Sequence, residues 1–288
     1  MSPWQFLLDV ANPHLDFLLR ALVMAGIAAA VCGVVGCFVV VRGMAFIGDA
    51  VSHAVFPGLA IAFALHASVL AGGAVAGGLV AVAIACLSQR RAVREDSIIG
   101  IFFAAAFALG MVIISRVEGY TASLTSFLFG SLTGVSASDI GVGAVVSALI
   151  IGVIIVLLPQ LTAVCLDRET ARALGLPVAA LDLALYLCVT GAVVISVGTI
   201  GNILVLALLI TPAATARLLC RELVPMMWCA AGIGTAGSVV GIYLAWALDL
   251  PAGATIVLTL TAAFLVAWAA QPFISSRLIT EEPCPVAS

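Results

Sequence analysis

The stretch ALVMAGIAAAVCGVVGCFVVV, residues 21–41, contains no charged side chain and is followed directly by Arg42. At about 1.5 Å per residue, a helix of this length crosses a hydrocarbon core of about 30 Å. An arginine at the edge of such a run is typical of the point where a helix leaves the membrane. The stretch therefore predicts a membrane span that ends at Arg42.

Similar apolar runs recur along the whole chain. Of the 288 residues, 64% are hydrophobic and 9% are charged, whereas soluble domains carry about 25% charged residues. The sequence therefore predicts an all-α, polytopic transmembrane bundle of eight or nine spans, forming a single domain over residues 1–288. The expected spans lie near 17–41, 47–66, 68–88, 97–116, 139–163, 180–198, 201–220, 225–248 and 254–274. Residues 121–133, apolar but short, indicate an interfacial or re-entrant piece.

The arginines predict the orientation of these spans. If the first span runs from outside to inside, nine of the eleven arginines are cytoplasmic, and only Arg20 and Arg116 lie outside. Because cytoplasmic loops are rich in basic residues, we expect an external N-terminus and a cytoplasmic C-terminus. Residues 1–16 have no basic segment and predict an interfacial segment rather than a cleaved signal. Residues 276–288 are expected to form a cytoplasmic tail.

Two missing motifs narrow the functional classes. The chain has no lysine, so it cannot contain the G-x-x-x-x-G-K phosphate-binding loop, whose lysine contacts the nucleotide phosphates. No H-E-x-x-H motif is present either, and no nucleophile stands out beside a base. We therefore do not expect this chain to be an enzyme, and we expect no permanently bound cofactor.

Asp49 and His53 are the ionisable residues that most need explaining. Both fall in the predicted span 47–66, where a charge costs at least about 2.5–3.5 kcal/mol and is usually functional. Their spacing of four places both side chains on one helical face. Counted as a helix from Arg42, His53 lies roughly 16 Å into the membrane. A carboxylate and an imidazole are partial ligands for manganese, zinc or iron.

A purely structural explanation of this pair is also open, namely a buried ion pair that fixes helix packing. Ser52 lies on the adjoining face, and Pro57 with Gly58 is expected to weaken the helix and free backbone carbonyls toward a cavity. Ser52, Pro57 and Thr211 are the candidate pore-lining residues. His66, near an outer loop, is more simply interfacial.

The remaining acidic residues have simpler explanations. Asp182 begins a predicted span, where the positive end of the helix dipole favours an acid. Asp249 is expected to mark a helix boundary, with a gate or partner contact as the alternative. Glu118 and Asp139 flank the outer segment 121–133 and are candidates for a partner contact.

A mixed-charge loop, residues 167–176, interrupts the apolar pattern. Asp167, Glu169 and Arg172 favour a short helix with a polar cap, and Gly175 with the following Pro177 favours its end. A solvated loop explains the charge but not so compact a helix. A docking element for a cytoplasmic subunit explains both.

Several segments in a fixed order resemble the ABC-3 family of permeases, the membrane subunits of bacterial manganese, zinc and iron ABC importers, and most nearly its actinobacterial members. The segments that carry the resemblance are 42–58, 95–110, 129–131, 167–175, 201–216 and 249–253. The resemblance implies a multi-pass protein of the bacterial plasma membrane.

The resemblance also implies partners and roles. It implies a homodimer of permeases, two copies of a cytoplasmic ATP-binding subunit, and an external metal-binding lipoprotein. Asp49 and His53 match the polar pair of the family's pore-lining helix, and 167–175 matches its coupling helix, with Asp167, Glu169, Arg172 and Gly175 as contacts to the ATPase. The expected function is alternating-access import of manganese or zinc, driven by ATP on the partner subunit.

Two other functions stay open at this stage. A secondary transporter or channel would work without an ATPase, but it leaves the short cytoplasmic helix without a purpose. Within ABC importers, an iron-chelate permease for haem or a siderophore would need a wide apolar cavity and no Asp–His pair.

Overall fold

The computed structural model describes residues 6, 10, 12, 15–65, 67–89, 93, 95–115 and 134–278. Within these residues all regular structure is helical, as the sequence predicts. The helices are α2 (Asp16–Arg42), α3 (Ile47–Ala64), α4 (Val69–Ser88), α5 (Glu95–Ile114), α7 (Ala137–Leu166), α8 (Arg168–Ala173), α9 (Val178–Ile200), α10 (Asn202–Leu219), α11 (Leu223–Leu248) and α12 (Ala252–Leu278).

Most of these helices are long and apolar enough to cross a membrane. In the described part of the chain, seven meet that standard, namely α2, α4, α5, α7, α9, α11 and α12, and α10 contributes a shorter apolar segment, Leu204–Leu219. α3 has 18 residues. The nine predicted spans correspond one to one with α2–α5, α7 and α9–α12. The predicted segment 121–133, most of residues 1–16 and the tail beyond residue 278 lie outside the described residues.

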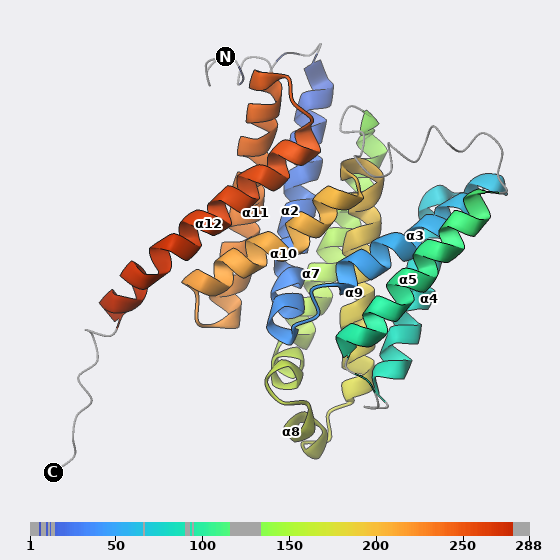
Figure 1. The fold of residues 1–288 in the computed structure, drawn as a ribbon, viewed down its shortest axis with the longest axis vertical. Helices are drawn as coiled ribbons and strands as arrows, with labels where there is room; N and C mark the ends of the chain where they lie inside the picture. The colour runs from blue at the N-terminus through green and yellow to red at the C-terminus, as the bar shows by residue number, and fades with distance from the viewer. Residues whose placement is uncertain are drawn as a thin grey trace.

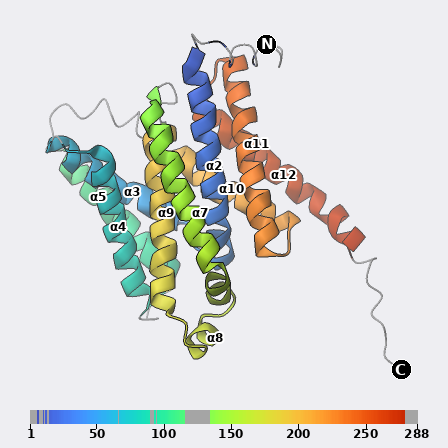
Figure 2. The same ribbon diagram turned by 180° about the vertical axis from the view of Figure 1, so that it is seen from behind.

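The bundle has two groups of helices joined mainly through α9 (Figure 1). α2 packs against α10 and α11, and α12 covers these two helices from outside. α3 packs against α4 and α5, and α9 contacts α2, α3 and α4. Figure 2 shows α7 beside α2 and α9 on the other side of the molecule. α2 is the central helix, since 72% of the residues in its most apolar segment are buried, whereas the value for α12 is 22%.

Two ends of the bundle can be distinguished in Figure 1. α2 finishes at Arg42 at the same end as α8, which projects beyond the long helices. We call this the α8 end. The N-terminus of α2 and the turn between α11 and α12 lie at the opposite end. Successive long helices therefore alternate in direction, as expected for a protein that crosses a membrane repeatedly.

Close helix crossings depend on glycines in α3 and α4. A Cβ built at Gly58 would lie 2.3 Å from the Gly72 carbonyl oxygen, and one at Gly72 would lie 2.5 Å from the Gly58 oxygen. A Cβ at Gly77 would lie 2.9 Å from the Thr190 side chain of α9. The small-x-x-x-small pattern predicted such approaches, and they occur at Gly72 and Gly77. At Gly78 a Cβ would meet nothing within 4 Å.

Candidate functional site

The sequence-predicted pair, Asp49 and His53, lies on one face of α3. The His53 Nε2 atom is 3.5 Å from the Asp49 Oδ1 atom. The Asp49 side chain is 27% exposed and the His53 side chain is 16% exposed. A small ion can therefore reach both in a single copy of the chain. A carboxylate oxygen and an imidazole nitrogen therefore lie side by side, both partly exposed.

Two aromatic rings of α5 hold the imidazole. The ring centroid of His53 lies 4.9 Å from that of Phe103 and 5.1 Å from that of Phe107, at interplanar angles of 78° and 85°. These are edge-to-face contacts, which favour particular ring orientations. The position of His53 therefore depends on α5 as well as on α3.

The predicted neighbours Ser52 and Pro57 have different surroundings. Ser52 is fully buried, and its hydroxyl donates to the Gly48 carbonyl at 2.7 Å. α3 continues through Pro57, so the expected weak point is not a break in the helix. The proline nitrogen has no hydrogen, however, and the carbonyl of His53 loses its usual helical donor.

The path of the chain to the pair differs from the sequence estimate. That estimate counted one continuous helix from Arg42, but the chain turns at Gly43, whose φ is +70°, and α3 starts anew at Ile47. His53 is six residues beyond Ile47, or roughly 9 Å along the helix. His53 nonetheless contacts α5 at points eight and twelve residues beyond its first residue, or roughly 12 and 18 Å along that helix. α3 therefore starts inside the bundle, and the pair lies well away from the α8 end.

A single chain supplies an incomplete ligand set. Among the described residues no group of three or more His, Cys, Asp or Glu side chains is placed to hold a metal. Thr211 lies on α10, half-buried, and its carbonyl accepts from the Thr215 hydroxyl at 2.7 Å. The site is thus open to ligands from elsewhere.

A charge cluster at the α8 end is the feature that sequence reasoning missed. Asp182 is fully buried and pairs with both Arg42 and Arg168. The Gln89 amide also donates to its Oδ2 at 3.0 Å. α9 begins at Val178, so Asp182 lies in the second turn, where the helix dipole is a weak explanation. The sequence did contain one signal: an acid in an apolar segment is costly unless a partner neutralises it, so Asp182 requires a basic partner.

The same cluster continues to α5 and α8. The Arg168 Nη1 donates to both carboxylate oxygens of Glu95, at 3.0 and 3.1 Å. The Tyr186 hydroxyl donates to Glu95 as well, and Arg172 donates to the Gln89 carbonyl oxygen at 3.0 Å. Side chains from α2, α5, α8 and α9, together with Gln89 at the end of α4, therefore meet at one point.

The short helix predicted within residues 167–176 is present as α8. Asp167 caps it by accepting from the Glu169 amide at 2.9 Å. Gly175, at φ +78°, follows its end. Only Ala171 of this helix is buried, and the neighbouring Leu174 is 70% exposed. The helix and its C-terminal end thus expose both polar and apolar groups.

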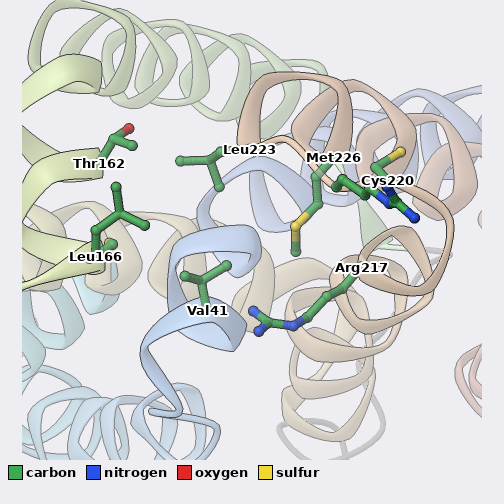
Figure 3. A pocket seen from close by; sticks show the side chains of 9 residues that line it. Val41, Thr162, Leu166, Arg217, Cys220, Leu223 and Met226 are labelled. Carbon is green, nitrogen blue, oxygen red and sulfur yellow. The ribbon is translucent and has the colours of Figure 1, made fainter. Parts of the chain in front are cut away.

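A separate hollow opens between α2, α7, α10 and α11 at the α8 end (Figure 3). Its volume is about 470 Å³, and its walls combine apolar side chains with the guanidinium groups of Arg217 and Arg221. Neither Asp49 nor His53 lines it. It is therefore distinct from the carboxylate–imidazole pair.

The remaining candidates have mostly structural roles or lie outside the described residues. Asp139 forms a capping box with Ser136 at the start of α7. Asp249, at φ +54°, ends α11, as the helix-boundary interpretation predicts. His66, Glu118 and Arg116 lie outside the described residues.

These observations define a class of protein: a multi-pass helical membrane protein with a carboxylate–imidazole pair on one of its helices and an exposed short helix at one end. The chain belongs to the ABC 3 transport family, whose model matches residues 14–271. It is accordingly a multi-pass protein of the plasma membrane.

Individual relatives cover nearly the whole chain. The manganese transport system membrane protein MntC of Halalkalibacterium halodurans is 40% identical over 272 residues, 94% of this chain and 93% of that protein. The "Probable iron transport system membrane protein" of Haemophilus influenzae is 32% identical over 254 residues, 88% of this chain and 93% of that protein. PsaBC from Streptococcus pneumoniae, solved in complex with Fab, contains a chain of TM-score 0.83 and 33% identity. That match covers 96% of this chain and all of the other.

Proposed function

We propose that this chain is the permease subunit of an ATP-driven manganese importer. The observation that carries the proposal is the Asp49–His53 pair, half-open and inside a span, in a member of the ABC 3 transport family. A buried packing pair would be sealed from solvent, whereas both of these side chains stay accessible.

The ligand chemistry accommodates manganese. Carboxylate and carbonyl oxygens suit Mn²⁺, and imidazole suits Mn²⁺, Zn²⁺ and Fe²⁺. Asp49 and His53 together offer a carboxylate and one imidazole nitrogen. Zinc remains chemically acceptable to this set, and a relative at 40% identity that is named for manganese transport favours manganese as the cargo.

An incomplete site suits transport rather than storage. Conduction requires an ion to leave as readily as it enters. In the proposed homodimer, two copies of α3 face the central pathway, and each contributes one Asp49–His53 pair. The ion is held briefly between them while the pathway opens first to the outside and then to the cytoplasm. The external metal-binding lipoprotein delivers the ion at the end opposite α8.

α8 is proposed to contact the ATP-binding subunit. Asp167, Glu169 and Arg172 supply its polar contacts, Gly175 ends the helix, and Leu174 provides an exposed apolar anchor. ATP binds to the separate subunit, because this chain lacks the lysine of a phosphate-binding loop. Under this proposal the α8 end is cytoplasmic.

The test is reconstitution in proteoliposomes with the candidate ATPase and binding protein. We expect ATP-dependent uptake of ⁵⁴Mn²⁺ that exceeds uptake of Zn²⁺ and Fe²⁺. Asp49→Asn should lower this uptake by at least about tenfold, because even groups that only support metal ligands contribute 10–100-fold. Ser52 lies three residues beyond Asp49 on the same helix. Ser52→Ala should leave uptake within about twofold, since the Ser52 hydroxyl already donates to the Gly48 carbonyl.

Two results would refute the proposal. Uptake of manganese that proceeds without ATP or without the ATPase would indicate a secondary transporter or channel. Equal uptake by wild-type protein and the Asp49→Asn variant, with both correctly assembled, would show that the pair is not part of the ion pathway.

A further inference from the structure

Three parts of the molecule that are distant in sequence are connected by direct side-chain contacts. α8 is joined to α5 by Arg168, whose Nη1 reaches both oxygens of Glu95. α5 is joined to the Asp49–His53 pair (the transport pair) by Phe103 and Phe107, whose rings contact His53 edge to face. The chain of contacts therefore runs from the exposed end of the molecule into the span that carries the transport pair.

α5 is suited to act as the rigid part of this connection. Glu95 is its first residue, and Phe103 and Phe107 lie eight and twelve residues further along. These spacings correspond to roughly 12 and 18 Å of continuous helix. α5 also packs along α3, so a shift or tilt of its first turn changes the contacts around His53.

The charge cluster has a sealed half and an accessible half. Arg42 and Asp182 are 4% and 0% exposed, whereas Arg168 and Glu95 are 27% and 19% exposed. Water can replace the outer contact when it opens, but it cannot replace the inner one. The inner pair therefore anchors α2 to α9, and the outer pair can open and close at a smaller cost.

We propose that Arg168 and Glu95 are positioning residues that transmit the movement of α8 along α5 to His53. The inference rests on the proposed function, in which α8 contacts the ATPase. When ATP closes the ATPase subunits, α8 moves, Arg168 displaces the first turn of α5, and Phe103 and Phe107 shift against the imidazole. The imidazole of His53 then no longer points at the held ion, and the ion is released.

A purely structural role does not account for the outer pair of Arg168 and Glu95. A partly exposed ion pair such as this one contributes at most about 1 kcal/mol of stability, because water screens the attraction. The inner pair and the Gln89 contact already connect the ends of α2, α4 and α9. The outer pair adds only the connection between α8 and α5, which is the connection a relay needs.

The experiment compares manganese uptake with ATP hydrolysis in the reconstituted complex. Glu95→Gln neutralises the carboxylate but keeps its size and its acceptor for Tyr186. We expect ATP hydrolysis and the KM for manganese to stay unchanged and the number of ions imported per ATP hydrolysed to fall about tenfold, the usual size of coupling between sites. Glu222→Gln, the same substitution at an exposed position next to α11, is the matched control. Glu95→Asp keeps the charge and should recover part of the ratio.

A second variant keeps the inference testable if Glu95→Gln fails to assemble. Arg168→Lys keeps a positive charge beside Asp182 but loses the guanidinium fork that reaches two carboxylates at once. It should show the same fall in ions imported per ATP. Wild-type uptake with an unchanged ratio in both variants would overturn the relay while leaving the proposed function intact. Failure of the wild-type complex to import manganese would instead refute the proposed function.

Discussion

At the scale of single residues, Asp182 and Arg42 form the part of the structure most sensitive to substitution. The Arg42 Nη2 binds Asp182, while its Nη1 is buried without a hydrogen-bond partner in the described part of the chain. The guanidinium charge therefore depends chiefly on one carboxylate. Removing one member of such a buried pair leaves an uncompensated charge, which costs more than removing both.

We therefore expect Asp182→Asn to lower the free energy of unfolding by about 3–5 kcal/mol. The measurement is unfolding of the purified protein in detergent, followed by tryptophan fluorescence. Asp16→Asn is the matched control, because Asp16 and Arg20 form an exposed pair at 49% and 40%, for which the cost is at most about 1 kcal/mol. Equal effects of the two substitutions would show that the cluster does not hold the helix ends together.

At the scale of helices, the crossing of α3 with α4 fixes the position of the helix that carries Asp49 and His53. Gly58 follows Pro57 and sits against Gly72 backbone to backbone. In a membrane, where apolar side chains gain little from leaving the lipid, such close approach is a main source of helix association. The sequence pattern of glycines in α4 predicted this packing, but it could not say which glycines face α3 and which face lipid.

Two alanine substitutions in α4 separate these cases. Gly72→Ala should destabilise the protein by about 1–3 kcal/mol, because the new methyl group overlaps the Gly58 carbonyl and forces a backbone shift. Gly78→Ala should be neutral or stabilising by up to about 1 kcal/mol, since the position is open and alanine favours a helix. Both are measured by the same unfolding assay. A Gly72→Ala variant as stable as the Gly78→Ala variant would contradict the observed crossing.

α8 is the other element whose formation can be tested separately. It has six residues, too few for a helix to be stable by its own propensity. Its cap at Asp167 and its side-chain contacts to Glu95 and Gln89 therefore account for much of its order.

Loss of the cap should weaken binding of the ATPase. Asp167→Ala removes a cap worth about 1 kcal/mol, which corresponds to roughly a fivefold increase in the Kd for the ATP-binding subunit. Asp167→Asn, which caps helices equally well, should bind almost as the wild-type chain does. Binding is measured by titrating the labelled ATPase onto nanodiscs containing the permease. If both variants lose affinity equally, the charge of Asp167 rather than its cap makes the contact.

At the scale of the whole molecule, the fold was predictable from sequence and the charge cluster was not. Apolar runs such as residues 21–41 report on one helix at a time, and each matched a helix of the structure. Asp49 and His53 were found because they are four apart on the same helix. Asp182 and Glu95 are 87 positions apart, and their common contact to Arg168 depends on how α5, α8 and α9 pack. Spacing within one helix cannot reveal such a contact.

The charge cluster also predicts the number of membrane crossings. Arg42 ends α2, Gln89 ends α4 and Glu95 begins α5, and all three lie at the α8 end because they share the contacts of Asp182 and Arg168. The chain can return from Arg42 to the start of α4 at the far end only if α3 crosses the bundle. Together with α10, this gives nine crossings in the described part of the chain and places the start of α2 and the end of α12 on opposite sides.

Reporter fusions test this topology. A fluorescent protein fused after Gly175 or at the C-terminus should fold and fluoresce, because both positions are expected in the cytoplasm. Alkaline phosphatase, active only outside the cytoplasm, should be active when it is fused after Asp249. An active phosphatase at the C-terminus would mean that one of the shorter helices, α3 or α10, does not cross the membrane. If that helix were α3, the charge cluster could not form on one side and the relay from α8 to His53 would fail with it. A non-crossing α10 would leave the cluster intact, because all of its residues precede α10.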